Sequence, residues 1–404
     1  MVASFAQVPF GMKQLLCSFL VSGILLSGLY EVRFGYIFGA AAILLTAIAV
    51  LLRTPILPVN SKASIFVFLL PFFIVLSWCY GLFLGIYNGN NISYVFSNFA
   101  GLSLYLMFYF FWAFSYEVKF FYRVLLACAV ICSLWGLVNW TLFVGAQPQA
   151  EGFSGGRVYI SATLLYGVTF CSVYLFSRFF PGDQNRLLYS EANKIGFFLV
   201  AFFLVALILP ARSKGFLLSV FLVVSLCMFF LTIDVALRGR FKVVALLPFA
   251  CAAIAGFFLL YYYDYFYQSF SSDNVSNQIR SEQFEYLKAE IKFMGSGLGA
   301  VLESGYARDD TGYGFELTYV NIVHKLGVFS FILFLSYAVT ALYALRFIFN
   351  PKLRIYGGFI IGLISFLVPG AGNPMLLSPA MVLLHSAALY YIYSYISGKN
   401  TEVG

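Results

Sequence analysis

A succession of apolar segments, each about 20 residues long, constrains this chain more than any other feature, because a helix needs roughly that length to cross the hydrocarbon core of a bilayer. Polar connections that contain Gly, Pro or charged residues separate the segments. Of the 404 residues, 62% are hydrophobic and only 10% are charged, which is far from the balance of a soluble domain. The sequence therefore predicts an all-α, polytopic membrane helix bundle.

About twelve transmembrane spans can be placed on this rule. They cover residues 13–31, 34–52, 63–86, 95–115, 122–144, 158–177, 195–210, 214–233, 243–262, 317–346, 355–370 and 377–397. The first run simply continues into further spans after Lys13, so we interpret it as a membrane helix rather than a cleaved signal peptide. All seven cysteines lie within apolar runs, so no disulfide framework is expected.

The distribution of positive charge predicts the orientation. Most of the 24 basic residues fall in alternate connections, and the short loop 238–242 is especially rich in them. Cytoplasmic loops carry the excess of Lys and Arg, so we expect both termini to be cytoplasmic. The net charge of +8 then belongs to inner loops that face anionic lipid, and it does not indicate nucleic-acid binding.

One predicted outer connection, residues 263–316, is much longer than the others and holds more than half of the chain's 16 acidic residues. It divides the chain into spans 1–9 (residues 1–262), the loop itself, and spans 10–12 (residues 317–404). A loop of this length is usually functional or disordered. A solvated cap with no further role is the simpler alternative.

Residues 277–294 of this loop have the periodicity of an amphipathic helix. Such a helix lies on the membrane surface or covers a cavity. Its predicted apolar face consists of Ile279, Phe284, Leu287, Ile291 and Met294. The Gly-rich turn that follows is not predicted to bind a nucleotide, because no strand precedes it and the Walker lysine is missing.

Four basic residues near predicted outer helix ends are candidates for binding an anion. Arg157 follows a glycine-rich stretch at a helix start, where free N–H groups and the helix dipole favour negative charge. Arg212 and Lys214 lie in a very short hairpin, and Arg280 lies in the long loop. Anchoring to lipid headgroups is the simpler alternative. Because the arginine fork matches phosphate oxygens, a diphosphate is the anion expected for a membrane enzyme.

The start of span 317–346 carries an acid, a histidine and a lysine. The helix dipole alone would explain Glu316 in a first turn. His324 lies eight residues further on, on about the same face, and is expected to stand behind Glu316. Lys325 points elsewhere and is expected to extend to the membrane surface. The only other histidine, His385, lies inside the last span, so no metal site is predicted.

Four segments follow one another along the chain in this order: "GFSGGRVYISATLLYG", "ARSKG", "GSGLGAVLESG" and "ELTYVNIVHKLGVFSFILF". Together they resemble the O-antigen polymerase and O-antigen ligase superfamily of bacterial polysaccharide assembly, over residues 152–334. The resemblance implies a GT-C-like bundle of about twelve helices in the inner membrane of a Gram-negative bacterium, with a periplasmic loop that caps the site. It also implies glycan transfer from an undecaprenyl-diphosphate carrier without a metal or other cofactor.

The resemblance implies roles for particular residues. In the ligase, a histidine stands at the head of the span after the long loop, and this chain has Glu316 there, which favours a polymerase with Glu316 as the general base. The diphosphate-binding residues would be Arg157, Arg212, Lys214 and Arg280. Arg308 and Tyr319 would belong to the substrate-contacting loop.

The implied partners are a glycan donor and a glycan acceptor, both linked to undecaprenyl diphosphate, together with membrane lipid and a chain-length regulator protein. Three alternatives remain open. The chain could be a ligase or a protein O-oligosaccharyltransferase of the same superfamily. It could be a metal-dependent glycosyltransferase that uses Glu31, although a paired acidic motif is lacking apart from Asp309–Asp310. A twelve-helix transporter fits less well, because no internal repeat is visible.

Overall fold

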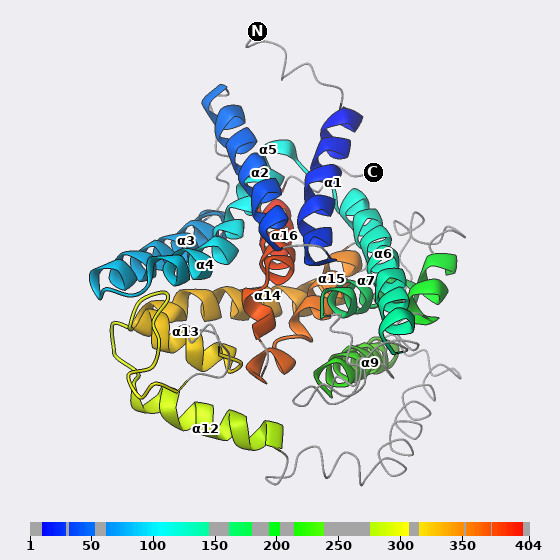
Figure 1. The fold of residues 1–404 in the computed structure, drawn as a ribbon. Helices are drawn as coiled ribbons and strands as arrows, with labels where there is room; N and C mark the ends of the chain where they lie inside the picture. The colour runs from blue at the N-terminus through cyan, green and yellow to red at the C-terminus, as the bar shows by residue number, and fades with distance from the viewer. Residues whose placement is uncertain are drawn as a thin grey trace.

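Every regular element in the described part of the computed structural model is a helix (Figure 1). The structure describes residues 10–29, 32–52, 62–144, 161–179, 194–202, 214–237, 275–306, 315–350, 353–372 and 374–398. The all-α prediction is confirmed for these residues. The predicted span 243–262 lies outside them.

The long helices follow the predicted spans in order. Those of the first half are α1 (Phe10–Leu26), α2 (Val32–Leu52), α3 (Lys62–Tyr87), α4 (Ile92–Ser103), α5 (Met107–Phe114), α6 (Val118–Val144) and α7 (Ser161–Phe179). Residues 194–202 are also helical, within the span predicted at 195–210. The second half contains α9 (Lys214–Leu237), α12 (Val275–Ala289), α13 (Thr318–Leu326), α14 (Ser330–Phe349), α15 (Arg354–Ile364) and α16 (Pro379–Ile396).

Short 3-10 helices extend or interrupt these elements. They are η2 (Ser27–Leu29), η3 (Leu104–Leu106), η6 (Gly327–Phe329), η7 (Pro369–Gly372) and η8 (Pro374–Leu377). The span predicted at 317–346 is thus two helices joined through η6. Gly327 ends α13 at φ +55°, in a region that L side chains rarely adopt, and this explains why the break falls on a glycine.

Six helices within the described ranges are long and apolar enough to cross a membrane. They are Phe34–Leu51, Lys62–Tyr87, Ile92–Phe114, Val118–Val138, Thr318–Phe349 and Arg354–Gly372. Gly11–Leu26, Leu165–Phe176 and Leu218–Phe230 are apolar but shorter. The chain is therefore a multi-pass helical membrane protein. The number of twelve spans, the division at residues 262 and 316 and the periplasmic side of the loop stay predictions.

Helix α16 lies at the centre of the bundle (Figure 1) and packs against α3, α5 and η3. Ser378 caps its N-terminus by accepting a hydrogen bond from the N–H of Met381 at 3.3 Å, and Pro379 occupies the first turn, where its missing N–H costs nothing. Nearly every side chain of α16 is buried. Because protein rather than lipid surrounds the helix, it can carry tyrosines and a histidine at membrane depth.

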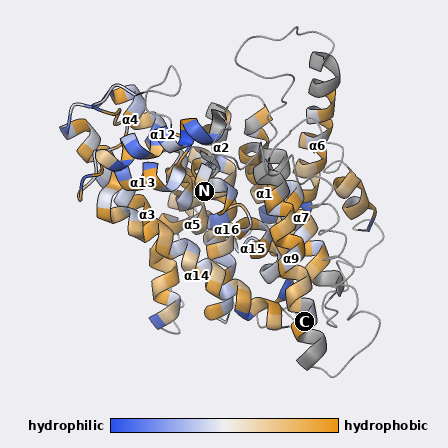
Figure 2. Ribbon diagram, turned by 90° about the horizontal axis from the view of Figure 1, so that it is seen from below, coloured by the Kyte–Doolittle hydropathy of each residue, from blue (hydrophilic) through white to orange (hydrophobic). Residues whose placement is uncertain are grey.

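Hydrophilic residues gather on α12, whereas hydrophobic residues dominate α3, α9 and α14 (Figure 2). This polar helix lies beside α13 at the edge of the bundle (Figure 1). The residues that follow α12 run back into the bundle as a buried segment, residues 295–300, which we call the glycine strap. α12 and the glycine strap together hold α13 in place.

The glycine strap binds the C-terminal end of α13. The N–H groups of Ser296 and Gly297 donate to the carbonyls of His324 and Lys325, at 2.8 and 3.0 Å. Those carbonyls belong to the last turn of the helix, whose C=O groups have no N–H donors within the helix itself. The N–H of Leu298 donates to the carbonyl of Gly81 on α3 at 2.8 Å. The strap therefore joins α13 to α3 through main-chain hydrogen bonds.

Close approach between two backbones explains the strap's glycines. Gly297 has φ +83°, and a Cβ at this position would overlap the backbone nitrogen of Gly85 on α3. A Cβ on Gly85 would in turn overlap the carbonyl oxygen of Leu298. The glycines of this turn thus allow the two backbones to pack closely.

Candidate functional site at the α12–α13 junction

The N-terminal end of α13 is bound by a side chain of α12. The amide oxygen of Gln283 accepts hydrogen bonds from the N–H groups of Glu316 and Leu317, at 3.0 and 3.1 Å. Leu317 is the N-cap of α13 and cannot cap with its own side chain. Gln283 thus satisfies N–H groups that a helix start leaves without partners. A helix of nine residues is marginal alone, and α13 is held at both ends by the segment that precedes it.

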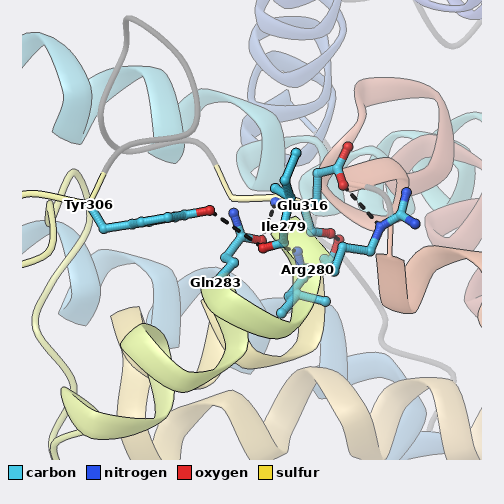
Figure 3. A network of polar contacts seen from close by, with 7 residues as sticks. Ile279, Arg280, Gln283, Tyr306 and Glu316 are labelled. Carbon is cyan, nitrogen blue, oxygen red and sulfur yellow. Dashed lines mark hydrogen bonds and ion pairs between the residues drawn. The ribbon is translucent and has the colours of Figure 1, made fainter. Parts of the chain in front are cut away.

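Glu316 and Arg280 form an ion pair at this junction (Figure 3). Nε of Arg280 donates to Oε2 of Glu316 at 3.0 Å. The two side chains keep 34% and 19% of their surface exposed, so a ligand can reach both. The pair joins residues that are 36 positions apart in the sequence. Arg280, Gln283, Glu316 and Leu317 are called the cap junction below.

Apolar and aromatic contacts support the cap junction from behind. Leu287, Leu302 and Phe315 form a small buried cluster against which Tyr306 packs. The ring of Tyr306 stacks on Tyr286 with centroids 4.8 Å apart, and its hydroxyl reaches the carbonyl of Ile279 at 3.5 Å (Figure 3). These contacts fix the rotation of α12 about its axis, which determines where Arg280 and Gln283 point.

The opposite side of the junction is the irregular segment after α15. Arg280 lies beside Gly372 in η7: a Cβ on this glycine would be 3.3 Å from Nε of Arg280. Tyr319 lies in the first turn of α13, three residues after Glu316. Its hydroxyl donates to the carbonyl of Leu367, and its ring packs on Phe334. The candidate site therefore lies between α12, the start of α13 and η7.

His324 is buried, and its ring meets that of Phe315 edge-on, with centroids 6.3 Å apart. Its Nδ1 is buried without a hydrogen-bond partner among the described residues. The ring is therefore not locked in place by polar contacts on that side. Its role near Glu316 stays a prediction.

The expectation that Lys325 extends to the membrane surface is wrong. Lys325 is only 3% exposed, and its Nζ donates to Oδ1 of Asn98 on α4 at 2.6 Å. The same amide oxygen accepts the N–H of Gly299 at 3.1 Å. The glycine strap closes over Lys325 and brings Asn98 within its reach, so the side chain is satisfied inside the protein and has no need to reach the surface.

The predicted apolar face of the amphipathic helix is also partly wrong. The helix ends at Ala289 instead of continuing to residue 294, and Phe284 is exposed. The inner stripe is Ile279, Gln283 and Leu287, at i, i+4 and i+8. Pattern reasoning passed over Gln283 because it is polar, although its spacing from Leu287 places it on the inner face. Asn98, inside an apolar span, carried no comparable signal.

Several predicted site residues cannot be placed at the junction. Arg157, Arg212 and Arg308 lie outside the described residues. Lys214 is the first residue of α9. Of the predicted set, the structure brings together Arg280 and Glu316, with Tyr319 close by and His324 deeper in α13. No group of His, Cys, Asp and Glu that could hold a metal ion occurs in the part of the chain that the structure describes.

The chain matches no known protein-family model, and no curated protein matches it at a significant level. A carboxylate that is partly open to solvent can accept a proton, and the adjacent guanidinium can bind an anionic group.

Proposed function

We propose that this protein is a membrane glycosyltransferase that polymerises oligosaccharide repeat units carried on undecaprenyl diphosphate. One observation supports this most: the residues assigned as general base and diphosphate ligand, Glu316 and Arg280, meet at 3.0 Å in a partly open position under a polar helix. The proposal includes about twelve spans in a Gram-negative inner membrane, cytoplasmic termini and a periplasmic site.

The reaction would proceed by displacement at the anomeric carbon of the donor glycan. The carboxylate of Glu316 takes the proton from a hydroxyl of the acceptor repeat unit, and the hydroxyl oxygen bonds to the anomeric carbon. The bond between that carbon and the phosphate oxygen breaks, and undecaprenyl diphosphate leaves as an anion. Arg280, with Arg157, Arg212 and Lys214, would stabilise this anion. The sugar–diphosphate bond supplies the energy, so no nucleotide is needed.

The ion pair gives this mechanism an order of events. In the structure Arg280 is bound to Glu316, so an arriving diphosphate competes with the carboxylate for the guanidinium. Binding of the donor would then free Glu316 to face the acceptor hydroxyl. Ligase and protein O-oligosaccharyltransferase activities use the same chemistry with another acceptor. Glutamate in place of the ligase histidine is the reason to favour the polymerase.

The decisive experiment compares two isosteric changes in cells that lack the chromosomal copy. Glu316→Gln should reduce long-chain polysaccharide by about 10²–10⁴-fold, because the amide cannot act as the base. Glu303→Gln is the matched control, since Glu303 is an exposed acid of the same loop that also pairs with a cation, Lys292, at 2.9 Å. It should leave the product unchanged.

Gel analysis of the polysaccharide, with immunoblots for protein level, reads out both variants. A polymerase defect leaves single repeat units on their final acceptor, whereas a ligase defect leaves glycan on the carrier lipid. Normal long chains from Glu316→Gln at normal protein level would remove Glu316 from the mechanism and the proposal with it.

A further inference from the structure

The turn that joins α12 to the glycine strap exposes apolar side chains that no element among the described residues covers. Phe293 is 77% exposed, and Ile291 and Met294 beside it are exposed as well. Exposing these apolar side chains to water is unfavourable, although hydrogen bonds hold the rest of the segment in place. We propose that residues 291–294 insert into the surface of the lipid bilayer and anchor α12 and the cap junction there. The inference does not depend on the proposed enzymatic function.

Helix α14 gives the first measure of where this turn lies. α14 has 20 residues, and at 1.5 Å per residue it spans about 30 Å, the thickness of the hydrocarbon core. The carbonyl of Phe293 accepts the N–H of Val328 at 2.9 Å, two residues before α14 begins. Phe293 therefore stands level with one end of the hydrocarbon core, where interfacial aromatic residues lie.

Helix α3 gives a second, independent measure. Its 26 residues span about 39 Å, so part of the helix extends beyond the core. The hydroxyl of Tyr80, two turns before the C-terminus of α3, donates to the carbonyl of Met294 at 3.0 Å. Tyrosine is enriched at the membrane–water interface. Both helices thus place the turn at the boundary between hydrocarbon and headgroups.

The outward faces of both helices continue into the turn. On α3, the exposed residues Phe73, Leu76 and Phe83 share a helix face with Tyr80, with spacings of three and four. On α14, exposed Phe331 leads a stripe that continues through Leu342 and Leu345. Tyr80 also packs on Phe329, with ring centroids 4.4 Å apart. The lipid-facing surfaces of two spans therefore meet at Phe293 and Met294, which identifies lipid as the occupant.

Charge attraction contributes little to this anchor. Lys288 and Lys292 flank the turn, but each lies near a glutamate: Lys288 is 3.6 Å from Glu285, and Lys292 is 2.9 Å from Glu303. Their charges are locally compensated. Binding should therefore rest on buried apolar area and should be insensitive to the fraction of anionic lipid.

Tryptophan fluorescence in nanodiscs tests the anchor directly. The full chain carries Phe293→Trp, and its emission is compared with that of the parent, in lipids with and without bromine on the acyl chains. Leu342→Trp, on the α14 stripe, is the positive control, and Glu282→Trp, on the exposed side of α12, is the negative control. Because all three positions are exposed, the substitutions should not disturb packing.

The expected result is that brominated lipid removes most of the emission that Phe293→Trp adds, as for Leu342→Trp, and leaves that of Glu282→Trp unchanged. Replacing neutral lipid by anionic lipid should not alter the quenching. Emission from Phe293→Trp that is red-shifted and unquenched would overturn the proposal by placing the turn in water. Blue-shifted emission without quenching would overturn it too, because a protein surface would then cover the turn.

Discussion

Both histidines of the chain are buried, but they lie in two regions that differ in the hydrogen bonds available to the ring nitrogens. His385 belongs to a central cluster with Tyr105, Tyr337 and Thr340, deep in the bundle. Its ring stacks on Tyr337 with centroids 3.9 Å apart, and both ring nitrogens have partners, Tyr105 at 2.7 Å and Thr340 at 3.0 Å. His324 lies below the cap junction with Nδ1 buried and lacking a partner among the described residues.

The neighbours of His385 also determine its tautomer. The hydroxyl of Thr340 donates to the carbonyl of Ser336 at 2.8 Å, so towards His385 it acts as acceptor. Nε2 of His385 therefore carries the proton, and Nδ1 accepts from the hydroxyl of Tyr105. A histidine satisfied on both sides is a structural element. The ion pair of the cap junction instead keeps 34% and 19% of its two side chains exposed, so a ligand can reach it.

The largest effect on stability should come from the central cluster. His385→Ala removes a fully buried ring and leaves the hydroxyls of Tyr105 and Thr340 without their shared partner, so we expect a loss of about 3 kcal/mol. Melting in detergent, followed by intrinsic fluorescence, measures it. His324→Ala is the contrasting variant and should cost less than His385→Ala, because both changes remove a buried ring but His324 has no hydrogen bond at Nδ1 to lose. Equal losses would erase the distinction between the two histidines.

A smaller effect should follow from breaking the cap junction at Gln283. Gln283→Leu keeps the volume of the side chain but withdraws the acceptor from the N–H groups of Glu316 and Leu317, at a cost of about 1–3 kcal/mol. Hydrogen exchange at those two amides should accelerate, while exchange in α16 stays unchanged. Glu282→Leu, on the exposed side of the same helix, is the control. Unchanged exchange at residues 316 and 317 would show that Gln283 does not hold α13.

The smallest effect belongs to the exposed pair Lys292–Glu303. The ammonium group of Lys292 lowers the pKa of Glu303 through a hydrogen bond and charge attraction. A carboxyl group with a lowered pKa stabilises the folded state above its ordinary pKa, and this contribution is lost as the pH falls through the lowered value. Lys292→Met should therefore melt only slightly below the parent at neutral pH and together with it in acid. A gap that widens in acid would contradict this sign.

Sequence patterns predicted the structure correctly where the chemistry of a single segment determines it. Apolar length alone located helices such as α2, α3 and α6 to within a few residues, because the bilayer sets the length of a span whatever it packs against. Sequence patterns also selected Glu316 and Arg280, which the structure brings into contact, while their functional roles stay predictions. Reasoning failed where a long-range contact decides, as at Lys325, whose partner Asn98 is 227 positions away.

The sequence by itself determined that the chain is a multi-pass helical membrane protein and that more than half of its acidic residues lie in one connection, residues 263–316. Only the tertiary structure decided that this loop holds α13 at both ends, that Gln283 faces inward, and that Arg280 reaches Glu316. The physical reason is the range of the interactions. Hydrophobic length and periodicity act within one segment, whereas capping hydrogen bonds and ion pairs depend on which backbones the fold brings together.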